Sequence, residues 1–584
     1  MSLVLGISNT GHDASAAIFR DGKLVAAIAE ERLSRIKSIG AIVPQRAIDE
    51  VLRMANATRL DVTHIAMMCG YFPEEYFKRP NLKRELWQKF VRLRRRLRNK
   101  PTQIIWTGHV LRETIGTNKT YLQCFRKALF LKQEKFSPNA QVSFHAHHDV
   151  HAILAGFYSG QEQCLVITAD GHGDLDEVHS SSIFRSGKLE KLSITEGLGR
   201  SPGLFYQIIT ELLGFRPVRH EGKVLGLAAF GNPTALLSTF KHALRLSPCG
   251  TKFDSDFEAY ADRKTFLSKS IQGYSREDVA AAAQQTLEDA YVSLVRNQIT
   301  QTGLHHVAMN GGVAANVKLN QRIAALPGVE SIFVYPGMSD TGNCVGCALL
   351  AQEMESSGFI KSNAHLLRDV YLGPSFTDKE IETELIKQGM TYEKLDEEQL
   401  IDRCARAMND GLVLGWFQGR MEFGPRALGN RSMVGRPTDA GINKSLNDRL
   451  ERTEFMPFAP SVLSECAADI FENISPAEHA AEFMTVTFDV KSEWKVQIPA
   501  VVHVDGTARP QIVRADRNRL YHKLISRYND LSGIPLILNT SFNVHEEPIV
   551  CCPTEGVRAV AEDRIDTLAI GSFWVDNPKQ SAYR

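Results

Sequence analysis

Four residues whose types suit a metal ion are spread along the N-terminal part of the chain. The stretch HAHHDVHA (145–152) places His147 and His151 four residues apart, so on a helix both imidazoles would share one face. Asp170 closes the apolar run CLVITAD, and Asp340 ends SIFVYPGMSD, where a helix is expected to begin. Two imidazoles with carboxylates and open coordination positions suit Fe(II), Mn(II) or Zn(II) better than a closed structural zinc site. On spacing alone, a hydrogen-bonded histidine pair is an equally acceptable interpretation. Three further histidines fall off that face or outside the pattern and are interpreted as bystanders: His145, His148 and His172.

A glycine pair marks a second candidate site. In MNGGVAANVKLN (309–320), Gly311 and Gly312 follow an apolar strand pattern and precede a helical one. Backbone N–H groups at such a junction can receive a phosphate or an adenosine. The alternative interpretation is a plain tight turn. The position of the glycine pair between a strand and a helix favours the nucleotide-binding interpretation.

Arginines near turn-forming residues form the third candidate site. They lie in GPRALGNRS (424–432) and DGTARPQ (505–511), and NTSFN (539–543) adds amide and hydroxyl donors. Arg426, Arg431 and Arg509 could together clamp phosphate or carbamoyl oxygens in bidentate fashion. Taken one at a time, each is as well explained as an ordinary loop-capping arginine.

The elements that must position these residues alternate between strand and helix patterns. Strands are expected at SLVLGISNT, ASAAIF and DGKLVAAIAE, with Asp21-Gly22 as a hairpin turn, and again at THIAMMCGY, QCLVITADGHGD, HVAMNGGVA, SIFVYPG and TLAIGSFWV. REDVAAAAQQTLEDAYVSLVRNQI is predicted to be a helix. Alternation of this kind predicts an α/β fold, and the initial hairpins make its sheet mixed.

Bulk composition narrows the class of protein. The chain has 584 residues, 43% of them apolar and 23% charged, with a net charge of +1. Its length predicts two or three domains, and its charge does not commit it to nucleic acid or membrane. No signal peptide or run of about 18 apolar residues is evident. The ten cysteines are scattered, and Cys344 and Cys347 lack a second pair, so we expect reduced thiols in a cytoplasmic protein.

One segment departs from this neutral composition. Residues 78–100 hold eleven Lys or Arg and one acidic residue, which could contact nucleic-acid phosphates. A solvated helix with an apolar stripe is the favoured interpretation, because the rest of the chain is nearly neutral. A domain boundary is expected near residues 360–398, where the apolar pattern breaks.

Taken together, the motifs resemble the O-carbamoyltransferases that tailor nodulation factors and antibiotics. The segments that carry the likeness span almost the whole chain in the order of the family: GHDASAA, AEERLSRIK, HHDVHA, VITADGHGD, GKVLGLAAFG, NGGVAANVKLN, YPGMSDTGN, GPRALGNRS, EFMPFAPSV, VDGTARPQ and LNTSFNVHEEPIV. The resemblance implies an N-terminal domain (1–370) with an actin/sugar-kinase-like fold, carrying a basic helical insertion at about 78–140. It implies a second domain (371–584) like a threonylcarbamoyl-AMP synthase.

The resemblance also implies the reaction. The C-terminal domain would make carbamoyl adenylate from ATP, with Mg2+, and carbamoyl phosphate. The N-terminal domain would then pass the carbamoyl group to a hydroxyl of a small-molecule acceptor, a natural product or a sugar, beside Fe2+ or another divalent metal. Neither a membrane nor nucleic acid is an expected partner, and a homodimer is compatible with the family.

Family positions map onto this sequence residue by residue. His12 would be the general base, which suits an imidazole titrating near working pH. The metal ligands would be His147, His151, Asp170 and Asp340. The nucleotide contacts would be Lys37, Gly171, Lys223, Asn310, Gly311, Gly312 and Asn316. Carbamoyl phosphate and the adenylate would be held by Arg426, Arg449, Arg452, Arg509, Asn539 and Ser541. The last set includes two arginines because LERTEFMPFAP lacks the lysine common at this position in the family and has Met456 in place of its last arginine.

Two other functions remain open from the sequence. Carbamoylation of a nitrogen or a thiol, as in hydrogenase maturation, would call for an acylphosphatase domain and N-terminal CxxC pairs, which the chain lacks. A tRNA-modifying factor resembling the threonylcarbamoyl transferases would use the basic segment, and its binding would weaken steeply with salt.

Overall fold

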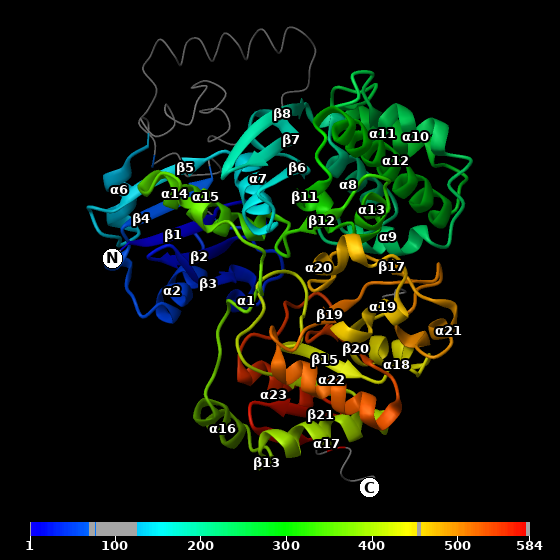
Figure 1. Cartoon of the computed structure of the whole chain (residues 1–584). Helices are drawn as coiled ribbons and strands as arrows, with labels where there is room; N and C mark the ends of the chain where they lie inside the picture. Colours follow the sequence, from blue (N-terminus) through cyan, green and yellow to red (C-terminus); the bar gives the residue numbers. More distant parts are fainter. Residues whose placement is uncertain are drawn as a thin grey trace.

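The computed structural model describes residues 2–41, 43–68, 76, 125–451, 457–577 and 579, and shows an α/β protein built on three large sheets (Figure 1). Two five-stranded sheets belong to the N-terminal part, and an eight-stranded sheet is formed by strands after residue 391. The basic segment 78–100 lies outside the described residues. Within the described part, no helix has the length and apolar character needed to cross a membrane.

The first sheet has the strand order β3-β2-β1-β4-β5. Its strands are β1 (Leu3–Ser8), β2 (Ser15–Arg20), β3 (Lys23–Ala29), β4 (His64–Met68) and β5 (Gln141–His145). The first three strands are antiparallel, whereas β4 and β5 run parallel to β1. The turn between β2 and β3 is at Asp21-Gly22, with φ of 46° and 78°, so the predicted hairpin is confirmed.

The second sheet repeats this topology. Its order is β12-β11-β6-β7-β8, with β6, β7 and β8 antiparallel and β11 and β12 parallel to β6. Its strands are β6 (Gln163–Ala169), β7 (Glu177–Arg185), β8 (Lys188–Glu196), β11 (His306–Asn310) and β12 (Ser331–Val334). The strand order and directions match the first sheet, and this duplication agrees with the expected actin/sugar-kinase-like unit. No internal repeat in the sequence indicates this duplication.

Two buried helices, α7 (His147–Tyr158) and α14 (Asn343–Glu355), pack between these sheets. Leu3, Leu5 and Ile7 of β1 face α2 (Gln45–Met54), while Gly6 faces α14. A Cβ at Gly6 would lie 1.8 Å from the carbonyl oxygen of Cys344, so only glycine lets the strand meet the helix backbone. Cys344 and Cys347 are free thiols fully buried in α14, as expected for reduced cysteines.

The third sheet has the order β13-β22-β21-β14-β15-β20-β16-β19. Its strands are β13 (Tyr392–Lys394), β14 (Leu414–Phe417), β15 (Arg431–Gly435), β16 (Ala459–Leu463), β19 (Gln511–Val513), β20 (Leu536–Ser541), β21 (Thr567–Ile570) and β22 (Phe573–Asp576). Along β14, Leu414 and Trp416 face α17 and α22, whereas Phe417 faces the opposite side, as strand alternation requires. The prediction of one strand over TLAIGSFWV was wrong, because Gly571 (φ 54°) turns the chain into the β21-β22 hairpin.

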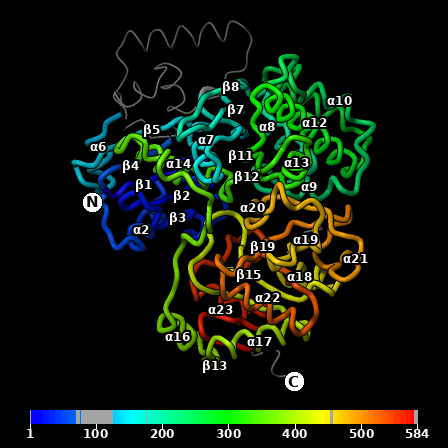
Figure 2. The backbone as a smooth tube through the Cα atoms, in the orientation of Figure 1, coloured from blue at the N-terminus to red at the C-terminus, as the bar shows by residue number. Residues whose placement is uncertain are grey.

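The remaining helices cover the sheets and build a helical lobe beside the second one (Figures 1 and 2). The N-terminal part contains α1 (Glu30–Ser34), α6 (Lys127–Gln133), α8 (Pro202–Leu212), α9 (Glu221–Ala228), α10 (Leu237–Ala243), α11 (Tyr260–Ser270), α12 (Arg276–Thr302), α13 (Val317–Ala324) and α15 (Phe359–Asn363). The C-terminal part contains α16 (Asp378–Lys387), α17 (Glu397–Asn409), α18 (Ile442–Arg449), α19 (Ala467–Ile470), α20 (Glu478–Ala481), α21 (Ser492–Lys495), α22 (Arg519–Ser532) and α23 (Pro553–Ala561). The predicted long helix is α12, which begins after the N-cap Ser275 and ends at Gly303 (φ 68°).

Candidate functional site

The first turns of α7 place two imidazoles on one face. The rings of His147 and His151 have centroids 4.8 Å apart, as expected for side chains one helical turn apart. The backbone N–H of His147 donates to Oδ2 of Asp174 at 2.7 Å, which anchors the helix start. The predicted shared face is therefore confirmed.

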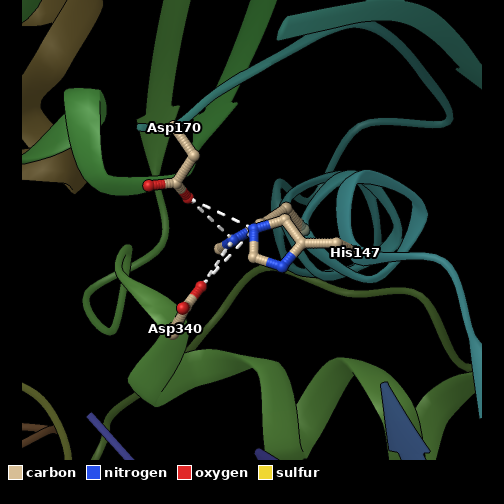
Figure 3. Close-up of side chains that lie close together, drawn as sticks. His147, Asp170 and Asp340 are labelled. Carbon is tan, nitrogen blue, oxygen red and sulfur yellow. Dashed lines mark ion pairs between the residues drawn. The ribbon is translucent and has the colours of Figure 1, made fainter. Parts of the chain in front are cut away.

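Two carboxylates meet these imidazoles from other elements (Figure 3). Asp170 follows the last residue of β6, and Asp340 opens the short 3-10 helix Asp340–Gly342 that leads into α14. Nε2 of His147 lies 3.5 Å from Asp170 Oδ2 and 3.5 Å from Asp340 Oδ1, and Nε2 of His151 lies 3.1 Å and 3.4 Å from the same atoms. One atom of each residue falls within 4.8 Å of the others, which is the spacing of a metal-ligand set.

The chemistry of this His147/His151/Asp170/Asp340 cluster suits a cation. Nε2 of His147 and Oδ2 of Asp170 are buried and have no hydrogen-bond partner among the described residues, despite their short separations. Burial would lower the pKa of His151, yet the two carboxylates raise it to about 9. Burial alone would raise the pKa of Asp170, but the two imidazoles hold that pKa well below its usual value. Orphaned buried donor and acceptor atoms around concentrated negative charge fit a divalent metal ion.

Polar neighbours fix the ligands in place. Asn343 donates through Nδ2 to Asp340 Oδ1 at 3.1 Å, and Asn310 donates to the carbonyl oxygen of His151 at 3.0 Å. His148 bonds to Thr168 Oγ1 at 2.8 Å instead of joining the cluster. His145 bonds to Ser143, and His172 pairs with Asp176. All three histidines interpreted as bystanders lie outside the cluster.

The predicted base stands at the edge of the cluster. Nε2 of His12 is 3.8 Å from Asp340 Oδ2, and its Nδ1 is 3.3 Å from Asp13 Oδ2, while 40% of its side chain is exposed. Burial lowers the pKa of His12, but Asp13 and Asp340 outweigh it and raise the pKa to about 10. A base at this position therefore needs a cation in the cluster to neutralise the carboxylates.

The glycine pair adjoins the same cluster. Gly311 has φ of 94°, and a Cβ on it would lie 2.3 Å from the carbonyl oxygen of Ala169. A Cβ on Gly312 would lie 2.8 Å from Asp170 Oδ1. The pair thus lets the 3-10 turn Gly312–Ala315 approach Asp170, after which Asn316 caps α13 through its side chain. Gly171 donates its N–H to Asp170 Oδ1 at 3.1 Å.

A second site lies between the N-terminal helices and the C-terminal sheet. A cavity of about 330 Å³ is lined by residues of α9 and α12, by Ala315 and Val317 beside the glycine turn, and by Arg426 and Arg509. Among the described residues, neither arginine makes a hydrogen bond or ion pair, and both Nε atoms are buried without a partner. Burial lowers the pKa of Arg426 to about 10, and burial together with the charge of Arg426 puts the pKa of Arg509 well below its usual value. Two adjoining, unpaired guanidinium groups fit an anion.

Arg431 does not line this cavity, so the structure does not bring the three arginines of the predicted clamp together. Its guanidinium is fully buried, donates to the backbone oxygens of Gln418, Gly419 and Pro374, and lies 3.6 Å above the ring of Phe417. Backbone carbonyls occupy both terminal nitrogens of Arg431, so this side chain supports the fold, and only its buried Nε has no partner among the described residues.

The other predicted substrate contacts vary in placement. Asn539 is 1% exposed and donates to the carbonyl oxygen of Ala427 and to Ser461 Oγ, so its amide supports the loop that carries Arg426. Arg449 pairs with Asp566 at 3.0 Å. Ser541 ends β20 and is partly exposed, Lys37 is partly exposed, and Lys223 is buried in α9. Arg452 lies outside the described residues.

Sequence reasoning missed one residue that shapes the arginine site. Oε1 of Glu422 accepts the backbone N–H groups of Leu428, Asn430 and Arg431 at 2.7, 2.8 and 3.0 Å. This carboxylate closes the loop that presents Arg426. The signal available was an acidic residue inside the otherwise apolar run MEF before a turn.

Comparisons with known proteins bear on both sites. Residues 3–349 match the family model described as Carbamoyltransferase N-terminus, and residues 405–577 match Carbamoyltransferase C-terminus. Nodulation protein NolNO of Sinorhizobium fredii is 33% identical over 97% of this chain and 79% of its own length. The 3'-hydroxymethylcephem-O-carbamoyltransferase of Amycolatopsis lactamdurans is 26% identical over 60% of this chain and 64% of its own.

Among solved structures, HypF of T. kodakarensis is similar at a TM-score of 0.32, with 13% identity over 62% of this chain and 49% of that chain. Component A of the Acidaminococcus fermentans (R)-2-hydroxyglutaryl-CoA dehydratase gives a TM-score of 0.35, with 16% identity over 61% and 100%.

Proposed function

This chain belongs to the carbamoyltransferase family and is a carbamoyltransferase enzyme, and from that premise we propose that it carbamoylates a hydroxyl of a small molecule by way of carbamoyl adenylate. The proposed donor substrates are ATP, with Mg2+, and carbamoyl phosphate. With one water, these yield carbamoyl adenylate, pyrophosphate and phosphate. The relative that acts on a hydroxymethylcephem supports a hydroxyl group as the acceptor.

The observation that supports the adenylation step is that two neighbouring arginines have no ion-pair partner among the described residues. Arg426 and Arg509 line one cavity, and neither forms an ion pair with a described residue. Two carboxylates also line this cavity but pair elsewhere, Glu288 with Arg322 and Asp505 with Lys318. Guanidinium groups bind phosphate and carboxylate oxygens through parallel hydrogen bonds, each worth about 1.5–3 kcal/mol when charged. We infer that they hold carbamoyl phosphate and the adenylate phosphate. The glycine turn that opens on the same cavity would receive the nucleotide.

For the transfer step, we infer that His147, His151, Asp170 and Asp340 hold a divalent metal such as Fe2+. When bound, the metal supplies a positive charge for the nucleotide phosphate and polarises the carbamoyl oxygen. Nδ1–H of His12 donates to Asp13, so its Nε2 is the atom that takes the acceptor proton. The acceptor oxygen bonds to the carbamoyl carbon as the bond from that carbon to the AMP oxygen breaks.

This scheme assigns one reaction step to each domain. We propose that residues 1–370 form the transfer domain, with Lys37 and Lys223 near the nucleotide. Residues 371–584 would form the adenylating domain and resemble a threonylcarbamoyl-AMP synthase. The duplicated sheets and the metal-ligand cluster support the first assignment, and the arginine pair supports the second.

Pyrophosphate release tests the proposal. Metal-loaded protein with ATP should release pyrophosphate only when carbamoyl phosphate is added. Release that does not depend on carbamoyl phosphate, or no release at all, contradicts it. Candidate hydroxylated metabolites can then be screened by mass spectrometry for a carbamoyl adduct, with His12→Ala as the control that should form none.

A further inference from the structure

Glu546 reaches from the C-terminal part of the chain to the N-terminal part. It lies in the loop after β20 and has φ of 61°, a left-handed conformation that residues other than glycine seldom adopt. Within the loop, the side-chain amide of Asn543 donates to the backbone oxygens of Val544 and Glu547 at 2.9 and 2.8 Å. Backbone of this kind persists where surrounding contacts hold it, and functional positions are enriched in it.

The carboxylate of Glu546 has several N-terminal partners. Nδ1 of His220 accepts the backbone N–H of Arg216 at 3.2 Å, so the ring hydrogen is on Nε2, which donates to Glu546 Oε1 at 2.8 Å. Nη1 of Arg219 donates to Oε2 at 3.3 Å. Partial burial would raise the pKa of Glu546, but His220 and the charge of Lys37 lower it to about 2. The carboxylate is therefore ionised and bridges two donors.

These partners belong to the segment that leads to Lys223, and one of them also contacts the segment of Lys37. Arg219 also donates to the backbone oxygen of Lys37. His220 directly precedes α9, which contains Lys223 and lines the cavity between the two parts. In the same loop Val218 has φ of 67°, an outlier for a β-branched residue. A strained loop of this kind needs an external contact to keep its shape, and Glu546 supplies one.

We propose that Glu546 is a positioning residue for carbamoyl transfer, holding residues 35–40 and 216–228 in their nucleotide-binding arrangement from the adenylating part of the chain. The proposal rests on the proposed function, because that function makes Lys37 and Lys223 nucleotide contacts. It implies that the loop after β20 must be docked for the transfer site to be complete. Glu546 thus links the C-terminal part of the chain to the segment that carries Lys223.

Hydrogen exchange on the full-length, metal-loaded protein without nucleotide tests the coupling directly. Backbone amides of residues 216–228 should exchange about tenfold faster in Glu546→Ala, because a charge-assisted contact worth about 1.4 kcal/mol or more is lost. Glu546→Gln should fall between, since its amide oxygen still accepts from His220. Glu562→Ala is the control, because Glu562 is an exposed carboxylate of the C-terminal part that pairs with Arg558 and Arg564 of the same part. Unchanged exchange in Glu546→Ala overturns the proposal.

A second readout separates positioning from general support of the fold. The concentration of a non-hydrolysable ATP analogue that protects residues 216–228 should rise about fivefold or more in Glu546→Ala. Carbamoyl-phosphate-dependent exchange of pyrophosphate into ATP should stay within about twofold of the wild type. A parallel loss of both overturns the positioning role. An analogue that gives the wild type no protection contradicts the proposed nucleotide site, whereas the exchange without nucleotide still tests the coupling.

Discussion

Two buried charge clusters in this protein have opposite signs and opposite needs. Around His147 and His151, two carboxylates concentrate negative charge where only a proton or a metal ion can balance it. At the cavity between the two parts of the chain, Arg426 and Arg509 concentrate positive charge, and neither forms an ion pair with a described carboxylate. An unbalanced buried charge destabilises the ligand-free protein, so each cluster suits a ligand with the opposite sign.

Arg431 sharpens the comparison. Arg431 has the same donors as Arg426, belongs to the same motif and is fully buried. Its terminal nitrogens nevertheless donate to backbone carbonyls. Burial of a charged side chain therefore does not identify a binding residue. Burial of a guanidinium group in which no nitrogen has a described partner is the better sign, and Arg431 fails it because its terminal nitrogens donate to carbonyls. At the other cluster, Nε2 of His147 and Oδ2 of Asp170 are buried without a described partner.

Removing one carboxylate from the negative cluster should have the largest effect. Asp340→Asn leaves the shape but halves the charge, so we expect metal content to fall to about a tenth and carbamoyl transfer to fall about 1,000-fold. Pyrophosphate release should continue, because it belongs to the other cluster. Metal analysis and both assays check this, with the exposed Asp256→Asn as control. Retained metal in Asp340→Asn would break the assignment.

Replacing Arg431 should damage stability before it damages chemistry. Arg431→Met leaves several buried carbonyls without donors, so we expect a loss of about 3–5 kcal/mol in the free energy of unfolding. Denaturant unfolding measures it. The fraction that stays folded should keep its affinity for carbamoyl phosphate. A stable variant that has lost this affinity would instead put Arg431 among the ligand contacts.

Replacing Arg509 should damage chemistry without lowering stability. We expect Arg509→Met to lower carbamoyl-phosphate-dependent pyrophosphate exchange about 100-fold, because a charged hydrogen-bonding partner of the substrate is lost. Its metal content should not change. In buffer without phosphate its melting temperature should rise, since one of two like charges is gone, and carbamoyl phosphate should stabilise the wild type alone. A lower melting temperature in that buffer would argue that Arg509 is structural.

The smallest expected effect concerns a neighbour of the metal ligands. Asn343→Ala removes the donor to Asp340 Oδ1, so we expect about tenfold weaker metal binding with little change in pyrophosphate exchange. Titration of apo-protein with Fe2+ or Mn2+ under anaerobic conditions measures it. Equal affinity in variant and wild type would show that Asp340 is held by its position at the start of the 3-10 helix alone.

Much of this arrangement could be predicted from local pattern. Helical spacing was sufficient to put His147 and His151 on one face, and strand alternation with turn residues was sufficient to find most of the strands that lead to Asp170 and the glycine pair. These predictions depend on residues a few positions apart, where backbone geometry alone fixes the relation. The break of TLAIGSFWV at Gly571 was missed because a glycine inside an apolar run fits a strand as well as a turn.

The sequence by itself thus determined the residue types of the metal cluster, the α/β alternation and, through the resemblance of its motifs, the family. Only the tertiary structure decided that Asp340 meets the two imidazoles, which lie 189 and 193 positions away in the chain. It also decided that Arg431 donates to backbone carbonyls while Arg426 and Arg509 do not. The contact of Glu546 with His220 is a third feature of this kind. The reason is that hydrogen-bond satisfaction depends on every group around an atom, and those groups come from distant segments brought together by the packing of the sheets.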